Sequence, residues 1–372
     1  MHIMFVGGGT AGHINPALAV AGYIGANYPD CKISYIGTKK GMENRLVPLA
    51  GYDFYSVDVA GFQRKLTVKN IFRNIDAVRK VFTSSIEARK LLKKLKPDIV
   101  FGTGGYVCGP VLREAAKMGI MTAVHEANAY PGVTIKMLAP TVDLVMVAME
   151  DALKNLNPKN KPVVTGNPIR RSLKSVSKAE ARRVLGVPEN ANVLLSFGGS
   201  LGARVINNAM LEVIERTLKN KEFYIFHATG KNAYSEYMEK LSGMDFNPEN
   251  SVVNVYEYID NMEVLMAAAD LVICRAGAMT VNELQVCGKP AILIPSPYVA
   301  ENHQFHNAMS LKRNNAAELI EEKDLNGDVL YKTIVRMFAD KKALDEMSKQ
   351  ALKIAISDAD RRIAEELLAL IK

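Results

Sequence analysis

Three glycine-rich segments each follow a short apolar run typical of a β-strand and precede a helical pattern. They are residues 7–13 (GGGTAGH), 102–110 (GTGGYVCGP) and 198–203 (GGSLGA). Glycine lets the backbone approach an anion closely, and the helix that follows presents free N–H groups and partial positive charge. One such segment alone could be a tight structural turn. Three in one chain predict contacts with phosphate groups.

The first segment matches the dinucleotide pattern G-x-G-x-x-G at Gly7, Gly9 and Gly12. An NAD enzyme would place Asp or Glu at the end of its second strand to hold the ribose hydroxyls. Here that strand ends in residues 36–40, IGTKK, without an acid, which disfavours NAD. The phosphate-loop pattern GxxxxGK[ST] is also absent from the sequence, which disfavours an NTPase.

Polar residues of the second half could recognise a sugar nucleotide. Glu283 falls near the start of a helix, after an expected strand at 271–274. A carboxylate there either complements the helix dipole or accepts the two hydroxyls of a ribose. Residues 301–307 (ENHQFHN) bring histidine, amide and carboxylate side chains into one loop suited to sugar hydroxyls. As a zinc site this loop lacks a third ligand, so no metal is expected there.

The elements that must position these residues alternate between short β-branched runs and helical stretches, which predicts an α/β fold with parallel sheets. At 372 residues the chain suits two domains. Two Rossmann-like halves facing each other would leave a cleft at the carboxyl ends of their strands. Residues 155–168 are typical of a linker, and an amphipathic helix is expected over 341–372. Strands are expected at 2–6, 32–36, 99–101, 122–125 and 144–147, then at 192–197, 223–228, 252–255, 271–274 and 291–294.

Composition and charge narrow the function classes. The four cysteines are scattered, which predicts neither a disulfide scaffold nor a zinc ribbon and fits a reducing cytoplasm. The sequence has no basic leader and no run of about 18 apolar residues. Residues 61–96 hold eleven Lys or Arg against two acids, a net charge of +9 beside +8 for the whole chain. Such a block predicts an anionic partner, either nucleic acid or an acidic lipid surface.

An ordered set of motifs covers residues 7–308: GGGTAGHINPALAVA, GTGGYVCGP, HEANAYPG, GNPIR, FGGSLGA, YIDNM, CRAGAMTVNEL and ENHQFHNA. Together they resemble the family 28 UDP-N-acetylglucosamine transferases of peptidoglycan synthesis. The resemblance implies a GT-B fold, with two Rossmann-like domains, an interdomain cleft and a C-terminal helix that crosses back to the first domain. It implies an N-terminal acceptor and membrane-facing domain over 1–165, a UDP-GlcNAc-binding domain over 166–345, and a helix over 346–372 that packs back on the first domain.

The implied reaction is an inverting transfer of GlcNAc from UDP-GlcNAc to the C4 hydroxyl of undecaprenyl-pyrophosphoryl-MurNAc-pentapeptide. This is the step from lipid I to lipid II, with no cofactor. Within the same fold, another sugar transferase or a UDP-GlcNAc 2-epimerase stays open.

The resemblance also assigns residues. Ser200 would contact the diphosphate, Ile259 would bind uracil through its backbone, and Glu283 would take the ribose hydroxyls. Ala278 and Gln304 would hold GlcNAc. The sequence departs from the common pattern at Leu201 and His303, where many members have glutamine, and this affects the sugar contacts. The other implied donor residues are Asn128, Arg170, and Thr10, Ala11 and Gly12 of a turn facing the transferred sugar; Gly104, Gly105 and Tyr106 form the implied acceptor-side loop.

An inverting displacement needs a base for the acceptor hydroxyl and stabilisation of the departing UDP. His13 is the best candidate, because it closes the first glycine segment and an unperturbed imidazole has a pKa of about 6.5. Glu126 is the rival base. Metal-free stabilisation of UDP by helix dipoles and arginine is expected. The sequence Asp358-Ala359-Asp360 matches a DxD metal motif, but helix capping explains it better.

An apolar stripe runs through the basic block at three- and four-residue spacing and includes Phe72 and Phe82. The stripe could be core, or it could rest on an anionic leaflet. A lipid-linked acceptor favours the membrane, which predicts a peripheral protein on the cytoplasmic face. Nucleic acid is not the expected partner, because stacking aromatics are few among the charges. The expected membrane-facing residues are Lys69, Phe72, Arg73, Arg79 and Lys80.

Overall fold

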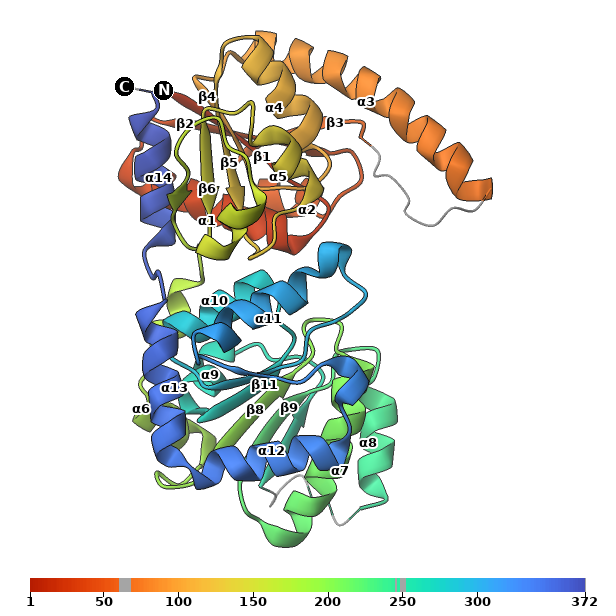
Figure 1. The fold of residues 1–372 in the computed structure, drawn as a ribbon, viewed down its shortest axis with the longest axis vertical. Coiled ribbons are helices and arrows are strands. Elements are labelled where there is room, and N and C mark those ends of the chain that lie inside the picture. The colour runs from red at the N-terminus through yellow and green to blue at the C-terminus, as the bar shows by residue number, and fades with distance from the viewer. Residues whose placement is uncertain (60–67, 245, 248–251, 372) are drawn as a thin grey trace. The chain divides into compact units, whose positions relative to one another are not determined.

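The computed structural model describes residues 1–59, 68–244, 246–247 and 252–371, and for residues 68–79, 81, 82 and 171 it describes the backbone alone. The chain divides into two compact units (Figure 1). Unit 1 comprises Met1–Ile169 and Ile356–Lys372, and unit 2 comprises Arg170–Ala355. No helix among the described residues is long and apolar enough to span a membrane.

Unit 1 is built on a parallel sheet with the order β3-β2-β1-β4-β5-β6-β7 among the described residues. Helices cover both faces, because the residues of its central strands are buried along their whole length. Its strands are β1 (His2–Val6), β2 (Lys32–Thr38), β3 (Asp53–Val57), β4 (Ile99–Gly102), β5 (Met121–Glu126), β6 (Leu144–Val147) and β7 (Val163–Val164), and its helices are α1 (Ala11–Asn27), α2 (Glu43–Leu49), α3 (Val68–Leu95), α4 (Cys108–Lys117), α5 (Val133–Leu138) and α14 (Ala359–Ala369).

The two faces of this sheet bury separate apolar clusters. In β1, Met4 and Val6 point to the cluster that includes α4 and α5, whereas Ile3 and Phe5 point to the cluster on the α1 side. The C-terminal helix α14 belongs to this second cluster through Ile363, Ala364 and Leu367, all fully buried. Burial of an Ile or Leu side chain contributes about 1.5–3 kcal/mol, so these contacts hold the end of the chain on unit 1.

Unit 2 repeats the pattern with the order β10-β9-β8-β11-β12-β13. Its central strands are again buried, and one large apolar cluster packs β8 and β9 against α7, α8 and α12. The elements are β8 (Val193–Phe197), β9 (Tyr224–Ala228), β10 (Val253–Tyr256), β11 (Leu271–Cys274), β12 (Ala291–Leu293) and β13 (Glu318–Leu319), with α6 (Lys178–Leu185), α7 (Arg204–Asn220), α8 (Tyr234–Ser242), α9 (Met262–Ala268), α10 (Ala278–Val286), α11 (His303–Arg313), α12 (Gly327–Ala339) and α13 (Lys341–Lys353).

These observations confirm the predicted α/β fold of two Rossmann-like halves. Three local predictions need correction. The short strand β3 was not expected, and β7 lies inside the predicted linker. The helix expected over 341–372 is two helices, because the chain leaves α13 at Lys353 and starts α14 only at Ala359.

In each sheet the order reverses beside the first strand of the unit, between β1 and β4 and between β8 and β11. Ligands of such sheets bind outside the carboxyl ends of the strands at this point. The glycine segments predicted from the sequence follow β1, β4 and β8, and the turn at 275–277 follows β11. The fold therefore places these candidate binding loops at the switch points of the two sheets.

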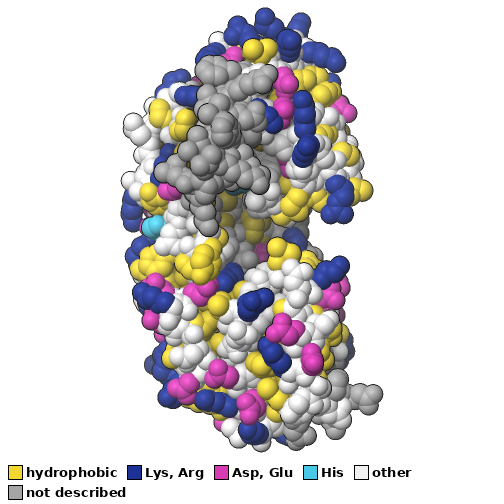
Figure 2. Space-filling model, turned by 90° about the vertical axis from the view of Figure 1, so that its right-hand side faces the viewer, with side chains coloured by type: hydrophobic (Ala, Val, Ile, Leu, Met, Phe, Trp, Pro, Cys, Tyr) yellow, Lys and Arg dark blue, Asp and Glu magenta, His cyan; other side chains and the backbone are white. Residues whose placement is uncertain are grey.

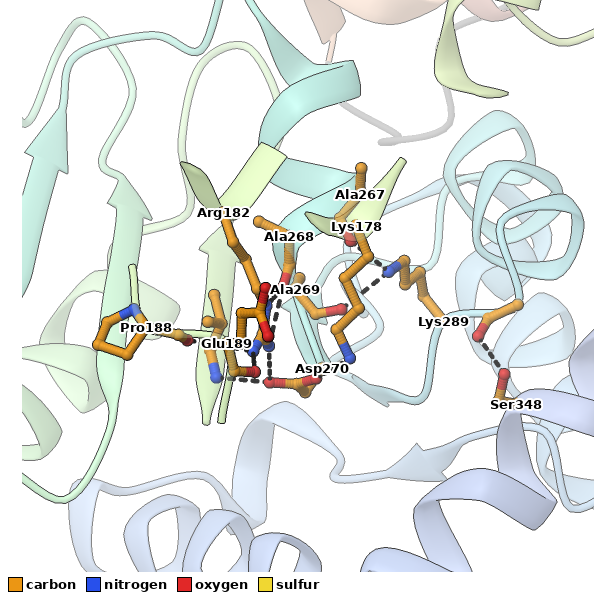
Figure 3. Close-up of polar contacts among 12 residues, drawn as sticks. Lys178, Arg182, Pro188, Glu189, Ala267, Ala268, Ala269, Asp270, Lys289 and Ser348 are labelled. Carbon is orange, nitrogen blue, oxygen red and sulfur yellow. Dashed lines mark hydrogen bonds and ion pairs between the residues drawn. The ribbon is translucent and has the colours of Figure 1, made fainter. Parts of the chain in front are cut away.

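The amino ends of the unit 2 strands carry a different polar cluster (Figure 3). Asp270 accepts hydrogen bonds from Arg182 at 2.6 Å and from the Val193 N–H at 2.8 Å, and it pairs with Lys178. Lys289 donates to the carbonyl oxygens of Ala267 and Ala269 at 3.0 and 2.8 Å. Burial lowers the pKa of Lys289 to about 8. This cluster lines a cavity of about 380 Å³ and ties α6 to the sheet.

Candidate functional site

The glycine loop of unit 2 is shaped to receive an anion at the start of α7. A side chain at Gly202 would meet the carbonyl oxygen of Thr229, and Gly202 has a φ of +75°, so glycine is required there. The preceding Ser200 is exposed. Ala203 caps α7 without a side-chain hydrogen bond, which leaves the first N–H groups of this 17-residue helix without a side-chain acceptor. Loop and helix together offer the donors that a diphosphate needs.

Two of the expected donor residues lie together. The Arg170 Nε atom is 3.4 Å from Oε1 of Glu283, although 113 residues separate them in the chain. Glu283 lies on the second turn of α10 and is 9% exposed, whereas the Arg170 side chain is 55% exposed. Burial raises the pKa of Glu283, and the Arg170 charge and hydrogen bond act in the opposite direction. Arg170 thus favours the ionised carboxylate that ribose hydroxyls would need.

Three more of the expected donor residues lie in loops and helix starts of the same unit. Ala278 is the first residue of α10, and Ile259 is buried in the loop between β10 and α9. Gln304 lies in the first turn of α11, and its Oε1 atom accepts a hydrogen bond from the Ser296 N–H at 2.9 Å. This bond fixes the loop after β12 to α11. It also orients the Gln304 amide, because the oxygen is already used.

The residues before α11 carry backbone strain. Glu301 and Asn302 both have a φ of +50°, in the left-handed region that residues other than glycine rarely adopt. Such strain costs on the order of 1–3 kcal/mol per residue and clusters at binding sites and switch regions. Two consecutive strained residues in the motif ENHQFHNA therefore mark this loop as a candidate ligand contact.

Sequence reasoning did not single out an ion pair behind this loop. Arg275 follows β11 and pairs with Glu322 at 2.7 Å, and both side chains are mostly buried. Arg275 also donates to the Ile294 carbonyl oxygen at 3.1 Å. These contacts tie the ends of β11 and β12 together. The arginine was visible in the motif CRAGAMTVNEL, but its partner lies 47 residues further along, so no local pattern could reveal the pair.

In unit 1, the expected base His13 contacts the second glycine loop. Its Nδ1 atom lies 3.1 Å from the carbonyl oxygen of Thr103, whose hydroxyl donates to the His13 carbonyl at 2.6 Å. A carbonyl can only accept, so Nδ1 carries the proton and Nε2 is the basic nitrogen of the neutral ring. Gly104 has a φ of +114°, and a Cβ there would lie 2.5 Å from Nδ1 of the His13 ring. The expected acceptor-side residues Gly104 and Gly105 therefore pack on the first loop, while Tyr106 is exposed.

The turn of Thr10, Ala11 and Gly12 starts α1, with Thr10 as its N-cap residue. Thr10 makes no side-chain capping hydrogen bond, although the helix runs for 17 residues. The first glycine loop of unit 1 thus ends in a helix start without a side-chain cap, as the loop of unit 2 does.

The rival base, Glu126, has its oxygens committed to the loop that follows β5. Oε1 accepts from the N–H and side-chain amide of Asn128 at 2.8 and 3.0 Å, and Oε2 accepts from the Gly132 N–H at 2.8 Å. Burial raises the pKa of Glu126, against the effect of these hydrogen bonds. The geometry suits an orienting role for Glu126, with Asn128 as its neighbour.

Glu43 was missed by the sequence reasoning. The end of β2 does meet a carboxylate, because Glu43 folds back from the start of α2 to accept hydrogen bonds from Thr38 and Gly9. Glu43 is fully buried, so it cannot reach a ribose. NAD therefore stays disfavoured, because the acid near the end of β2 is buried and not because an acid is absent. The signal was an acid five residues beyond Thr38, which a search limited to the strand end overlooks.

The DxD segment pairs with arginines. The Asp358 carboxylate lies 2.7 Å from Arg362 Nε and also contacts Arg361. Helix capping was expected for this segment, and Asp358 is the N-cap residue of α14, but its side chain makes no capping hydrogen bond. The Asp360 carboxylate instead accepts a hydrogen bond from the Arg361 N–H at 2.9 Å. The segment does open the helix, but Asp358 acts through ion pairs within the first turn.

The expected membrane-facing residues are described only in part. The side chains of Lys69, Phe72, Arg73 and Arg79 lie outside the described residues. Lys80 is described, and its ammonium pairs with Asp58 at 3.2 Å.

Comparisons with known proteins identify the family. The glycosyltransferase family 28 N-terminal domain matches residues 3–147, and the family 28 C-terminal domain matches residues 193–367. A UDP-N-acetylglucosamine–N-acetylmuramyl-(pentapeptide) pyrophosphoryl-undecaprenol N-acetylglucosamine transferase of Acetivibrio thermocellus is 46% identical over 372 residues, which is 100% of this chain and 99% of the relative. A transferase of the same name from Bacillus cereus, designated 1, is 40% identical over the full length of both chains.

Solved structures agree in fold. A crystal structure of Acinetobacter baumannii MurG superposes with a TM-score of 0.81 at 29% identity and covers 99% of both chains. A UDP-GlcNAc 2-epimerase from Neisseria meningitidis reaches a TM-score of 0.66 at 16% identity, over 99% of this chain and 100% of the other, which shows the shared fold alone. Both domains and the full-length relatives lead to one conclusion: the chain belongs to glycosyltransferase family 28.

Proposed function

We propose that this chain transfers GlcNAc from UDP-GlcNAc to the C4 hydroxyl of undecaprenyl-pyrophosphoryl-MurNAc-pentapeptide, with inversion at the sugar. The observation that carries the proposal is the 46% identity over the whole chain to a transferase of that name. The epimerase alternative has only its fold to support it, at 16% identity or less.

The proposed donor site lies in unit 2. Ser200 and the start of α7 would contact the diphosphate, Ile259 the uracil through its backbone, and Glu283 the ribose. Ala278, Gln304 and Arg170 would complete the contacts to the sugar and its leaving group. The pairing of Arg170 with Glu283 supports this assignment, because it joins two residues of the expected set in a half-buried polar contact.

The proposed acceptor side lies in unit 1. The Thr10–Gly12 turn would face the reacting groups, Gly104–Tyr106 the acceptor, and His13 would take the proton of the C4 hydroxyl through Nε2. Glu126 would orient Asn128. As UDP leaves, the negative charge that develops on its diphosphate would be stabilised by the N–H groups of α7 and by Arg170, without a metal.

The test is direct. Purified full-length protein is incubated with labelled UDP-GlcNAc, a short-chain lipid I analogue and EDTA, and the products are separated. A labelled β-linked disaccharide product is expected, in amounts that EDTA leaves unchanged. Conversion of UDP-GlcNAc to its 2-epimer without acceptor would favour the epimerase. Loss of activity in EDTA with rescue by Mg²⁺ or Mn²⁺ would disprove the metal-free step.

We also propose that the protein acts peripherally on an anionic membrane, at the cytoplasmic face where its acceptor would be held. A groove of about 930 Å³ between α3, α4 and α5 supports this. Its wall includes Ile86, Val133 and Met137, each more than half exposed, and Arg89 and Arg113 also line it. Figure 2 shows Lys and Arg side chains gathered at the upper end of unit 1 with hydrophobic ones among them. Exposed apolar surface beside basic residues is typical of contact with anionic lipid.

Replacing Lys69, Arg73, Arg79 and Lys80 with Gln should weaken co-sedimentation with anionic vesicles and spare activity on a soluble, short-chain acceptor. Each basic residue near such a surface contributes about 1 kcal/mol. Added salt should act in the same direction, since the attraction decays over a Debye length of about 8 Å at physiological ionic strength. Vesicle binding equal to wild type at low salt would leave the membrane contact elsewhere.

A further inference from the structure

Glu43 is a fully buried carboxylate at the loops of unit 1. Its Oε1 atom accepts hydrogen bonds from the Thr38 N–H at 2.8 Å and the Thr38 hydroxyl at 2.6 Å. Its Oε2 atom accepts from the Gly9 N–H at 3.2 Å. One side chain therefore joins the carboxyl end of β2 to the glycine loop that follows β1.

Glu43 is held without a countercharge. Within the part of the chain that the structure describes, no lysine, arginine or histidine pairs with it, and its oxygens accept hydrogen bonds from two backbone N–H groups and one hydroxyl. A buried carboxylate is costly unless its hydrogen bonds are made, so these donors and the carboxylate fix each other in place. Loss of the carboxylate would leave the Gly9 N–H and the Thr38 N–H and hydroxyl without the acceptor that they now share.

The glycine loop is fixed from two directions. A Cβ at Gly8 would collide with the Glu43 carboxylate, and a Cβ at Gly105 would collide with the carbonyl oxygen of Gly8. The first loop thus contacts Glu43 and also the second glycine loop, whose Thr103 and Gly104 contact His13. A displacement of the first loop would displace the start of α1 and, with it, His13.

We propose that Glu43 is a positioning residue for the transfer reaction, an internal anion that holds the first glycine loop so that His13 keeps its place against Thr103. This proposal rests on the proposed function, which gives His13 its role. In dinucleotide-binding units of this fold, the first glycine loop receives a pyrophosphate and the end of β2 supplies a carboxylate to the ribose. Here the Glu43 carboxylate lies between these two positions and bonds to both the loop and the end of β2. Unit 1 then needs no nucleotide at this place, in line with the proposal that unit 2 binds the nucleotide.

The test compares steady-state constants and unfolding temperatures in the transfer assay. Glu43→Ala should lower kcat by about 10–100-fold, the range expected when a reacting group is misplaced by roughly 1 Å, with the KM for UDP-GlcNAc within about twofold of wild type. Formate fits the space left by the carboxylate and should restore part of kcat, whereas chloride at equal concentration should not. Rescue by a small carboxylate is not expected from a merely destabilised protein.

Glu43→Gln keeps the side-chain volume and covers the case in which Glu43→Ala fails to fold. Its amide oxygen can accept from Thr38, but its NH2 group would face the Gly9 donor. This variant should lose kcat as well, without rescue by formate, because no space is opened.

Asp143 provides a matched control in unit 1. It accepts from the N–H and hydroxyl of Thr122 at 3.0 and 2.9 Å, the same pattern as Glu43 with Thr38, but at the amino ends of the strands. Asp143→Ala should lower the unfolding temperature and leave kcat unchanged. Wild-type kcat in Glu43→Gln, or equal losses of kcat in the Glu43 and Asp143 variants without formate rescue, would overturn the proposal. A wild-type protein without transferase activity would instead contradict the proposed function.

Discussion

The guanidinium of Arg170 lies 3.4 Å from the carboxylate of Glu283, and the two residues come from different parts of unit 2. Arg170 precedes the short helical turn at Arg171–Lys174, and Glu283 lies on α10. A further contact joins the same two segments, since Cys287 Sγ lies 3.9 Å from the Leu173 carbonyl oxygen. The position of Arg170 is therefore coupled to that of the helix carrying the proposed ribose ligand.

Glu283→Ala is expected to raise the KM for UDP-GlcNAc and to leave the fold intact. A hydrogen bond to a charged group contributes about 1.5–3 kcal/mol, which corresponds to roughly a 10–150-fold rise in KM. Steady-state kinetics with varied donor measure it. Glu236→Ala, at an exposed residue paired with Lys240, is the control and should keep the wild-type KM. An unchanged KM in Glu283→Ala would remove this residue from the donor site.

Arg170→Gln should make donor binding more sensitive to acid. Burial raises the pKa of Glu283 and Arg170 lowers it, so removal of Arg170 moves this pKa further up. Ribose binding needs the carboxylate, which is lost as pH falls through the pKa. As the pH falls, the KM for UDP-GlcNAc should therefore begin to rise at a higher pH in the variant than in wild type. Parallel pH profiles would show that Arg170 does not tune Glu283.

The positions of the glycine segments, each between a strand and a helix, could be predicted because their signal is local. Glycines between a strand pattern and a helix pattern can be recognised directly in the sequence, and the fold places such segments at the carboxyl ends of strands. The same logic gave Glu283, which follows the turn after β11. The pairing of Glu283 with Arg170 could not be predicted from the sequence, since it depends on how two segments 113 residues apart meet.

Other features could not be predicted from the sequence, because they depend on backbone geometry or on where the chain folds back on itself. The carbonyl of Thr103 fixes the His13 tautomer, and any residue type supplies a carbonyl. Glu43 reaches the end of β2 only because the chain turns back after Thr38. The edge strand β3 (DFYSV) is short and only partly buried, so its pattern is weak. The helical spacing of apolar residues continues through residues 354–358, so the break between α13 and α14 could not be predicted from it.

Lys289 should make the stability of the protein rise with pH. Its pKa is lowered to about 8 by burial, whereas an unfolded lysine has a pKa of about 10.4. Between these values the unfolded chain binds more protons, so the free energy of unfolding should increase with pH. This group contributes a rise of about 2 kcal/mol between pH 7.5 and pH 9.5.

The measurement is a pair of urea titrations for wild type and for Lys289→Met at these two pH values. The variant loses the donors to the Ala267 and Ala269 carbonyls at both pH values, so this cost cancels in the comparison. The pH-dependent part remains. The free energy of unfolding of wild type should therefore increase more than that of the variant between pH 7.5 and pH 9.5. A constant difference between the two proteins would place the pKa of Lys289 near its ordinary value.

His13→Ala should lower kcat by about 10²–10⁴, the usual contribution of a general base, with the KM for UDP-GlcNAc nearly unchanged. The Thr103 carbonyl holds the proton on Nδ1, so Nε2 is the nitrogen that would accept the proton of the acceptor hydroxyl. The variant should also lose the acidic limb of the pH–rate profile. Glu126→Gln is the comparison, because Glu126 already accepts three hydrogen bonds from Asn128 and Gly132. If Glu126→Gln abolishes turnover while His13→Ala is mild, Glu126 is the base and the assignment of His13 is wrong.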